Sequence, residues 1–391
     1  MITVTLKPGR EGPVIAGHPW VFSGAIAQIA GAGPAGSLAE VVAADGSVVG
    51  IGYVNPHCSI TVRMLSRQRE EINADFIFRR LTAALALRRA VLPPDTTAYR
   101  LVNGEGDFLP GIIIDVYSSF LVYQNLTAGA DLLKPLVVDG LVGLLSPQGI
   151  YEKSEGGVRQ EEGLANSAGI LCGEEPPPLV EIAENGCRFL VNVRGGQKTG
   201  FFLDQRDNRA LVGTMAQGKR LLNGFAYTGG FGLVAAKHGA RQVVSVDSSA
   251  AALRMAQKNW QLNHLVEAQE DFVQADMFSY LREITEPFEL IVLDPPPFVR
   301  RRQDRKVGIT GYKEINLQAL RLTAPGGQLF TFSCSQHLSA ADFHQTVLFA
   351  AADARRSVRV LKHLGPAADH PVNLAHPEGR YLKGLWLCLG D

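Results

Sequence analysis

Acidic residues and paired glycines stand where short apolar runs end in the C-terminal half of the chain. The run that ends at Phe225 is followed by the glycine pair of Ala226–Phe231, which permits a tight turn and a close approach of the backbone to a ligand. Later runs end at Asp247, Asp276 and Asp294. Carboxylates accept hydrogen bonds, so Asp247 suits both hydroxyls of a ribose and Asp276 suits an adenine amino group. The order of these signals predicts a site for an adenosine-containing cofactor.

Each signal alone is also typical of ordinary structure, because Gly-Gly turns are common and an Asp at a strand end often caps a helix. A nicotinamide cofactor would require G-x-G-x-x-G in the first turn. The chain instead has Tyr227-Thr228-Gly229-Gly230-Phe231, and a run of prolines follows Asp294. The sequence therefore does not favour a dinucleotide site.

Alternating strands and helices are needed to position these residues. Beyond about residue 190, strands are predicted at Arg220–Phe225, Gln242–Asp247, Asp271–Asp276, Glu289–Asp294, Gln328–Ser333 and Leu382–Leu389. Helical segments lie between most of them; Ala250–Leu262 has apolar residues at helical spacing and a serine, Ser248 or Ser249, able to cap it. This alternation predicts an α/β fold with a doubly wound, mostly parallel sheet, whose ligands bind outside the carboxyl ends of the strands.

The N-terminal half follows a different pattern. Short β-like runs have the spacing of a small barrel: Ile2–Leu6, Leu38–Ala43, Val48–Tyr53 and Ser59–Leu65. Helices are predicted over Ala74–Leu92 and Asp131–Leu145, and the proline-rich Gly173–Pro178 is typical of a linker. We therefore predict three domains: a β-barrel over residues 1–74, a central α+β domain over 75–178, and the α/β domain over 179–391.

Composition excludes several classes of protein. The 391 residues are 46% hydrophobic and 19% charged, which argues against disorder. Lys plus Arg and Asp plus Glu number 38 each, so any basic surface must be local. The five cysteines form no C-x-x-C pair, which predicts no metal site and no disulfides and favours a reduced, cytoplasmic setting. No apolar stretch approaches the roughly 18 residues of a membrane span, so no membrane partner is expected.

Several motifs together resemble one family. Asn223–Phe231 is similar to the first motif of class I methyltransferases, and in particular to that of the large-subunit ribosomal RNA cytosine-5 methyltransferases. Gln197–Arg209 matches the segment before that family's first strand, and Thr331–Ser335 and His376–Gly384 match its late motifs. Gly17–Phe22 resembles the opening of its PUA domain, an RNA-binding barrel. The likeness covers nearly the whole chain.

The resemblance implies a cofactor, a substrate and an assembly. The implied cofactor is S-adenosylmethionine, with these binding residues: Phe225, Tyr227, Thr228, Gly229, Asp247, Ser248, Asp276 and Asp294. The implied substrate is large-subunit (23S) ribosomal RNA, and the implied assembly is a homodimer. The chain departs from the family at Gly224, where a Cys is common, and at Pro297, which replaces the Lys of Asp-Pro-Pro-Lys-Phe. Any role of that Lys is therefore absent or supplied from elsewhere.

Methylation of cytosine at carbon 5 needs a nucleophile, because that carbon attacks poorly until a thiolate has added to carbon 6. Cys334 is the candidate, since it ends the predicted fifth strand in a Ser-Cys-Ser setting opposite Asp-Pro-Pro; a buried structural cysteine is the alternative. Asp294 is expected to hold the cytosine near N3 or its amino group, or else to cap the strand end. Glu378 is the candidate base for the carbon-5 proton, with a structural turn as the alternative.

The target base has to be single-stranded or flipped out of a duplex. Basic residues directly follow Asp-Pro-Pro-Pro-Phe and are candidates to bind phosphates: Arg300, Arg301, Arg302, Arg305 and Lys306. A solvated loop is the alternative. Phe298 and Tyr312 are expected either to stack on a base or to pack in the core. In the barrel, a modest basic face is expected from Lys7, Arg10, Arg63, Arg67 and Arg69.

Two other functions stay open. Methylation at another atom, such as guanine N7, would share the Tyr-Thr-Gly and Asp-Pro-Pro motifs but needs no nucleophile, because N7 already has a lone pair. A thiol at position 334 separates the two reactions. A catalytically idle RNA-binding or ribosome-assembly factor would keep the fold without binding S-adenosylmethionine, and the intact acidic positions argue against it.

Overall fold

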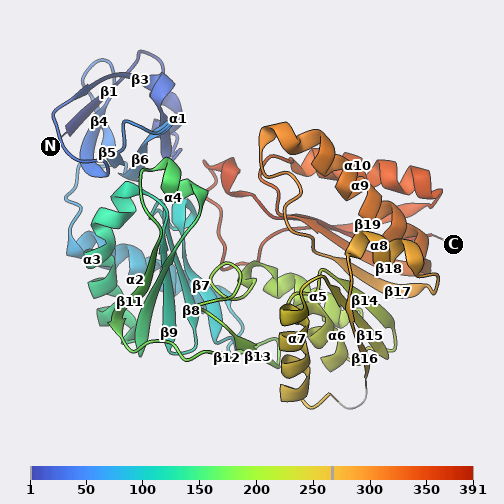
Figure 1. The fold of residues 1–391 in the computed structure, drawn as a ribbon. Helices are drawn as coiled ribbons and strands as arrows, with labels where there is room; N and C mark the ends of the chain where they lie inside the picture. Colours follow the sequence, from blue (N-terminus) through green and yellow to red (C-terminus); the bar gives the residue numbers. More distant parts are fainter. Residues whose placement is uncertain (1, 266–267, 391) are drawn as a thin grey trace. The chain divides into compact units, whose positions relative to one another are not determined.

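The computed structural model describes residues 2–265 and 268–390 and divides the chain into two compact units (Figure 1). The first unit contains the chain up to Ile182 together with Val191–Leu203 and Ala368–Gly379. The second unit contains Ala183–Leu190, Asp204–Ala367 and the chain from Arg380 onward. The chain therefore passes from one unit to the other several times.

The first unit opens with a β-sheet. Its strands are β1 (Ile2–Leu6), β2 (Trp20–Phe22), β3 (Ile26–Ala30), β4 (Ser37–Val42), β5 (Val48–Val54) and β6 (Ile60–Ser66), in the order β2-β6-β5-β4-β1-β3. A short helix α1 (Gly12–Ile15) follows β1. Alternate side chains such as Val4, Leu6, Val41 and Val62 form one core. The four strands that the sequence predicts here are confirmed to within one residue at each end.

A second sheet completes the first unit. Its strands are β7 (Ala98–Asn103), β8 (Ile112–Tyr117), β9 (Phe120–Asn125), β10 (Gly149–Ser154) and β11 (Ser167–Gly173), in the order β11-β10-β9-β8-β7. The predicted helices are confirmed as α2 (Ala74–Val91) and α3 (Ala128–Leu145), which Asn73 and Thr127 cap with their side chains. A short α4 (Gly157–Glu161) and the hairpin of β12 (Val180–Glu184) and β13 (Cys187–Val191) follow.

Buried charges hold the late segment Ala368–Gly379 within the first unit. The Arg88 side chain is fully buried, pairs with Asp107 and donates 2.8 Å to the carbonyl of Asp369. The carboxylate of Asp369 in turn accepts 2.9 Å from the backbone N–H of Arg100. Asn103 donates 3.0 Å to the carbonyl of Pro371. These bonds join residues more than 260 positions apart in the sequence.

The second unit is built on the predicted α/β sheet. Its strands are β14 (Arg220–Gly224), β15 (Gln242–Asp247), β16 (Gln269–Gln274), β17 (Phe288–Leu293), β18 (Thr323–Ser333), β19 (Val358–Leu364) and β20 (Lys383–Leu389). Their order is β16-β15-β14-β17-β18-β20-β19, with β20 antiparallel to both of its neighbours. The order reverses between β14 and β17, so a crevice is expected outside the carboxyl ends of these two strands. The sequence did not predict β19, and it placed β16 two residues too late.

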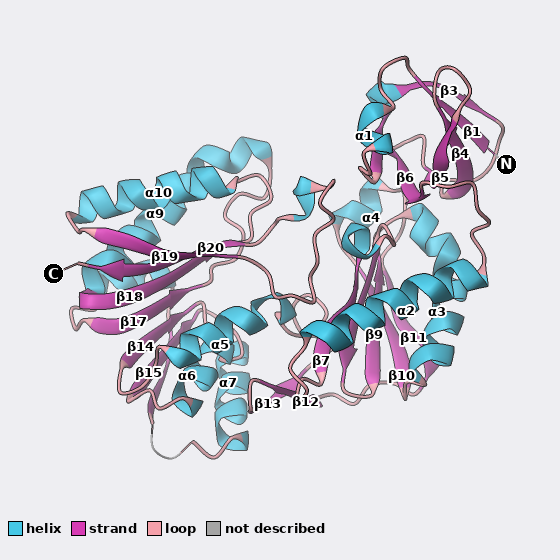
Figure 2. Ribbon diagram, turned by 180° about the vertical axis from the view of Figure 1, so that it is seen from behind, coloured by secondary structure: helices cyan, strands magenta, loops and turns pink. Residues whose placement is uncertain are grey.

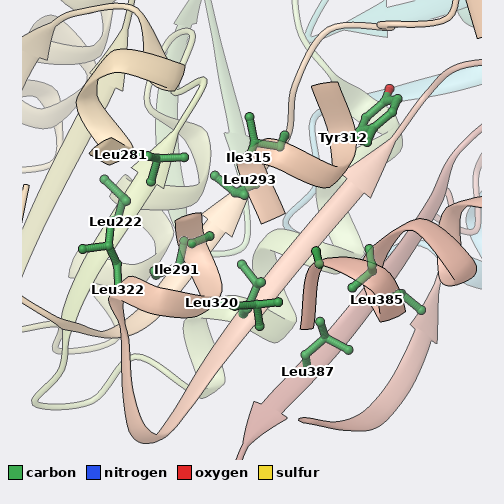
Figure 3. Packing of buried hydrophobic residues seen from close by; sticks show 14 of the residues in the cluster. Leu222, Leu281, Ile291, Leu293, Tyr312, Ile315, Leu320, Leu322, Leu385 and Leu387 are labelled. Atoms are coloured by element: carbon green, nitrogen blue, oxygen red, sulfur yellow. The ribbon is translucent and has the colours of Figure 1, made fainter. Parts of the chain in front are cut away.

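Helices cover both faces of this sheet (Figure 2). α5 (Arg206–Thr214), α6 (Gly230–Lys237) and α7 (Ala250–Leu262) lie on one face, and α9 (Arg305–Leu322) and α10 (Ala340–Ala354) lie on the other. α8 (Met277–Glu283) packs in the same core as α9 and α10. Strand side chains alternate between two cores: Leu290 and Val292 pack with α5 and α6, whereas Ile291 and Leu293 pack with α8, α9 and α10. Figure 3 shows the second of these cores, in which Tyr312 lies among leucine and isoleucine side chains.

Within the described residues, no helix combines the length and the apolar character that a membrane crossing requires.

The buried pair of Arg88 and Asp107 generates a stability prediction. Asp107→Ala leaves a guanidinium buried without its carboxylate, so we expect the first unit to lose about 3–5 kcal/mol of unfolding free energy. Hydrogen exchange of amides in β7 and β8, together with urea unfolding, measures the loss. Arg69→Ala is the control, because Arg69 is 70% exposed and its pair with Glu40 contributes at most about 1 kcal/mol. Equal effects of the two substitutions would contradict the prediction.

Candidate active site

The loop after β14 is held in a strained, compact shape at the point where the strand order reverses. Phe225 and Tyr227 both adopt left-handed backbone conformations, with φ of 59° and 48°. Gly229 follows with φ of 83° and begins α6 as its N-cap. A Cβ on Gly229 would lie 3.0 Å from the Cβ of Ala256 on α7, so the backbone approaches that helix closely. Non-glycine residues with positive φ are uncommon and concentrate at ligand-binding sites.

Asp247 ends β15 and fixes the loop from the neighbouring strand. One carboxylate oxygen accepts 2.8 Å from the backbone N–H of Tyr227, and the other accepts 2.8 Å from the N–H of Ser249. The carboxylate is half-buried, and each of its oxygens has a further lone pair available to a ligand. Ser248 next to it is exposed, and its carbonyl accepts 3.3 Å from the Gln274 side chain. The predicted cofactor residues of β14 and β15 thus lie at one edge of the sheet.

Asp276 lies two residues beyond β16 and is the N-cap of α8. Its carboxylate accepts 3.0 Å from the N–H of Ser279 and 3.2 Å from the Ser279 hydroxyl. Because β15 and β16 pair Asp247 with Gln274, Asp276 lies at the same edge as Asp247. The cap is therefore observed, and a contact of the exposed carboxylate with an adenine amino group stays a prediction.

Cys334 and Asp294 follow neighbouring parallel strands and meet at this edge. β17 and β18 pair Leu293 with Thr331, so Asp294 comes directly after β17 while β18 runs on to Ser333. The Cys334 sulfur lies 3.9 Å from the carbonyl oxygen of Pro295, the residue after Asp294. Both Cys334 and Asp294 are half-buried, so the thiol is not sealed inside the core. The structure thus brings together the two residues that the sequence singled out from different strands.

The Ser335 hydroxyl joins these two loops. It accepts 3.0 Å from the backbone N–H of Val299, which follows the proline run, and lies 2.9 Å from the Tyr312 hydroxyl of α9. Tyr312 is 0% exposed, so its alternative role of stacking on a base is wrong and core packing is confirmed. Phe298 packs against the Tyr312 ring, with a centroid separation of 4.6 Å, and is half-buried. We did not predict a role for Ser335 from the sequence. The signal that could have indicated one is its position next to the candidate nucleophile Cys334.

Glu378 lies in the first unit, among residues from two of the recognised motifs. It is 45% exposed, and its carboxylate lies 3.5 Å from Nε2 of His18 and 3.8 Å from Nε2 of His376. The His376 ring packs on Trp20, with centroids 4.3 Å apart. Burial lowers the pKa of His376, although the carboxylates of Glu105 and Glu378 oppose that shift. The Gly17–Phe22 and His376–Gly379 motifs therefore form one cluster.

The basic run after the proline loop is solvent-facing. Arg300, Arg301, Arg302, Arg305 and Lys306 are all exposed. Arg305 begins α9 and already pairs with Asp342 at 2.7 Å. The basic face expected on the barrel is only partly present: Arg63 is buried, lies 3.1 Å from Glu162 and 3.5 Å from Glu105, and does not face solvent. Arg69 is exposed but lies 2.8 Å from Glu40.

Family profiles match both halves of the chain. Residues 152–371 match the profile of S-adenosylmethionine-dependent methyltransferases, and residues 4–67 match that of the PUA-like domain. The chain belongs to the family of S-adenosylmethionine-dependent methyltransferases. A relative from Photobacterium profundum, named Ribosomal RNA large subunit methyltransferase I, is 44% identical over 389 residues, which are 98% of each chain.

Solved structures show the same fold at lower identity. A Streptococcus mutans protein described as a SAM-dependent methyltransferase has a TM-score of 0.84 at 22% identity and covers 99% of this chain and 100% of its own. A methyltransferase in complex with S-adenosylhomocysteine (SAH) has a TM-score of 0.85 at 23% identity, with the same coverage. The predicted α/β fold with an N-terminal PUA-like domain is confirmed for this methyltransferase.

S-adenosylmethionine is the cofactor of this methyltransferase, and the residues at the sheet edge fit it. Gly229 has no side chain, so the backbone of the turn is open to a ligand where it approaches Ala256. The Asp247 carboxylate, which binds the Tyr227 N–H of the same loop, has lone pairs that can accept hydrogen bonds from the ligand. When bound, the cofactor supplies an electrophilic methyl group. Among the described residues, no group of three or more His, Cys, Asp or Glu side chains is arranged to hold a metal ion.

The Gly229 turn generates a binding prediction. Gly229→Ala forces a left-handed conformation on a residue with a Cβ and presses that Cβ on Ala256, so we expect about a tenfold loss of affinity for S-adenosylmethionine, or ~1.4 kcal/mol. Isothermal titration calorimetry measures it. Gly218→Ala is the matched control, since Gly218 has φ of 70° but open space around its Cβ position. Wild-type affinity in Gly229→Ala would sink the prediction.

Proposed function

We propose that this protein methylates carbon 5 of a cytosine in large-subunit (23S) ribosomal RNA through a covalent adduct on Cys334. The observation that supports the reaction most is the half-buried thiol 3.9 Å from the Pro295 carbonyl, in the loop that begins with Asp294. A methyl transfer to a nitrogen with its own lone pair gives no reason for a thiol at this edge. The methyltransferase family membership supplies the methyl-donor chemistry.

Cys334, as the thiolate, adds to carbon 6 of the cytosine and forms a C–S bond, which makes carbon 5 nucleophilic. Asp294 orients the ring by hydrogen bonding near N3 or the amino group, where charge shifts during the addition. Carbon 5 then takes the methyl group. Loss of the carbon-5 proton to a base returns an electron pair to the ring, and the C–S bond breaks to release the thiolate. Atoms and charge balance without any metal or redox partner.

Glu378 stays our prediction for the proton acceptor, from the resemblance of its motif. Its carboxylate is 45% exposed and therefore open to exchange protons with solvent. The neighbouring rings of His18 and His376 offer a path for that proton, because an imidazole nitrogen lies within 4 Å of the carboxylate on each.

The RNA substrate is proposed from relatives and from local charge. The relatives at 41–44% identity bear the name Ribosomal RNA large subunit methyltransferase I. Because the chain has no net charge, phosphate contacts have to come from local clusters, and the exposed run from Arg300 to Lys306 follows the Asp294 loop directly. A homodimer and a cytoplasmic location stay predictions; light scattering of the purified protein tests the first.

Removal of the thiol is the direct test of the mechanism. Cys334→Ala is expected to lower methyl transfer to 23S RNA by roughly a thousandfold or more, because addition to carbon 6 is lost. Glu378→Gln is expected to accumulate an RNA adduct that resists denaturing electrophoresis, and the double variant to show none. Cys388→Ala, another half-buried thiol, is the control. Full activity in Cys334→Ala, or a product nucleoside other than 5-methylcytidine by mass spectrometry, would refute the proposal.

The basic run generates a salt-dependence prediction. Arg301→Ala with Arg302→Ala should weaken RNA binding and flatten the plot of log K against log salt by about 0.7 for each lost phosphate contact with a single strand. Fluorescence anisotropy with a labelled RNA fragment measures both quantities. The control is Arg359→Ala with Lys362→Ala, which removes two exposed cations from β19. An unchanged slope in the Arg301 and Arg302 variant would mean that the run is only a solvated loop.

A further inference from the structure

The late motif His376–Gly384 contains a buried lysine that the reaction above does not use. Lys383 is the first residue of β20, and the antiparallel register pairs it with Ser333, the residue before Cys334. The lysine is 7% exposed. Its Nζ donates 2.6 Å to the carbonyl of Ser335 and 2.6 Å to the carbonyl of Leu338. The ammonium thus bonds the turn that carries the thiol.

A buried ammonium needs a compensating partner. Transfer of an isolated charge from water into a protein interior costs several kcal/mol, so buried lysines are rare unless they are paired. In the part of the chain that the structure describes, no carboxylate lies within ion-pair distance of Nζ. Burial lowers the pKa of Lys383, and the negative charge of a Cys334 thiolate opposes that shift. The ammonium binds the carbonyl of the residue that follows Cys334, so the candidate nucleophile belongs to the same turn.

We propose that Lys383 is a positioning residue that holds a positive charge beside the Cys334 sulfur and so keeps the sulfur as the thiolate. The thiol proton leaves to solvent, and the charge that stays on Sγ is balanced by the ammonium. A nearby cation is a general means of activating cysteine nucleophiles. The inference rests on the proposed role of Cys334 and names the group that prepares it.

Other titratable groups lie close to this turn. Asp294 precedes the proline whose carbonyl the sulfur contacts, and a carboxylate at that place disfavours a second negative charge. Tyr312 lies behind Ser335, and burial raises its pKa, so its phenol is neutral near pH 7 and adds no charge. Lys383 brings a cation to this turn through the carbonyl of the residue after Cys334, and His337 of the same turn is exposed to solvent.

The test is the pH dependence of Cys334 alkylation in the full-length protein. Iodoacetamide reacts with the thiolate, and peptide mass spectrometry follows Cys334 with Cys172 and Cys388, also half-buried, as internal references. In the wild type, we expect a midpoint below the ordinary thiol value of about 8.5. Lys383→Gln keeps a donor for the carbonyls but removes the charge, and we expect alkylation of Cys334 at pH 7 to slow about tenfold, which corresponds to one pKa unit. Lys383→Arg should restore most of the rate.

The controls separate charge from folding. Lys362→Gln removes an exposed lysine of β19 and should leave the Cys334 profile unchanged. If Lys383→Gln and Lys383→Arg both fail to fold, the wild-type midpoint still decides, because a value at or above about 8.5 overturns the inference. A profile that is identical in Lys383→Gln and wild type overturns it as well. Alkylation requires no catalytic turnover, so an unchanged alkylation profile would overturn the role of Lys383 and leave carbon-5 methylation untouched. Conversely, full activity of Cys334→Ala would refute the covalent mechanism and leave the effect of Lys383 on the thiol intact.

Discussion

The hydrogen bonds of Ser335 are the constraint on which the candidate active site depends. Its hydroxyl receives the N–H of Val299 and meets the Tyr312 phenol, while its carbonyl receives the Lys383 ammonium. One residue therefore joins the β17 loop, the β18 loop, α9 and β20. Because Ser335 is 0% exposed, water does not compete for these bonds. These bonds tie the turn that carries the Cys334 thiol to the loop that begins with Asp294.

The sheet supplies the frame in which this joint works. Alternate side chains of each strand pack into the hydrophobic cores on the two faces of the sheet. The carboxyl ends of β14, β15, β17 and β18 are paired in parallel register at one edge. The first two ends present the cofactor loop and Asp247, and the next two present Asp294 and Cys334. All four ends belong to one edge of a doubly wound sheet, where ligands of such sheets bind.

Helices and strands whose apolar residues recur at a regular spacing could be predicted from the sequence. β15 and α7 were predicted residue for residue, because Gln242–Asp247 is bounded by turn signals and Ala250–Leu262 has a helical apolar stripe and a serine cap. β19 was not predicted because apolar residues of Val358–Leu364 are interspersed with Arg, Lys and His. The strand is largely exposed at the sheet edge. Asp276 was assigned to the end of a strand but caps α8, since the edge strand β16 stops two residues earlier.

Side-chain environments were harder to predict than elements. Cys334 and Asp294 could be placed at one edge from strand order alone. Arg63 was expected on the surface, yet two carboxylates distant in sequence bury it. The burial of Lys383 and of Tyr312 likewise depends on contacts with residues 45 and 23 positions away in the sequence. A local sequence pattern does not reveal such contacts.

The segment Ala368–Gly379 has a consequence for biosynthesis. Arg88 is an early residue whose guanidinium is satisfied in part by the Asp369 carbonyl, and Arg100 donates its N–H to the Asp369 side chain. Domains commonly fold as they emerge from the ribosome, N-terminal part first. The first unit of this chain cannot complete its core in that order, since its piece Ala368–Gly379 is translated after residues 204–367 of the second unit. The first unit would thus reach its finished state only after most of the second unit has been synthesised.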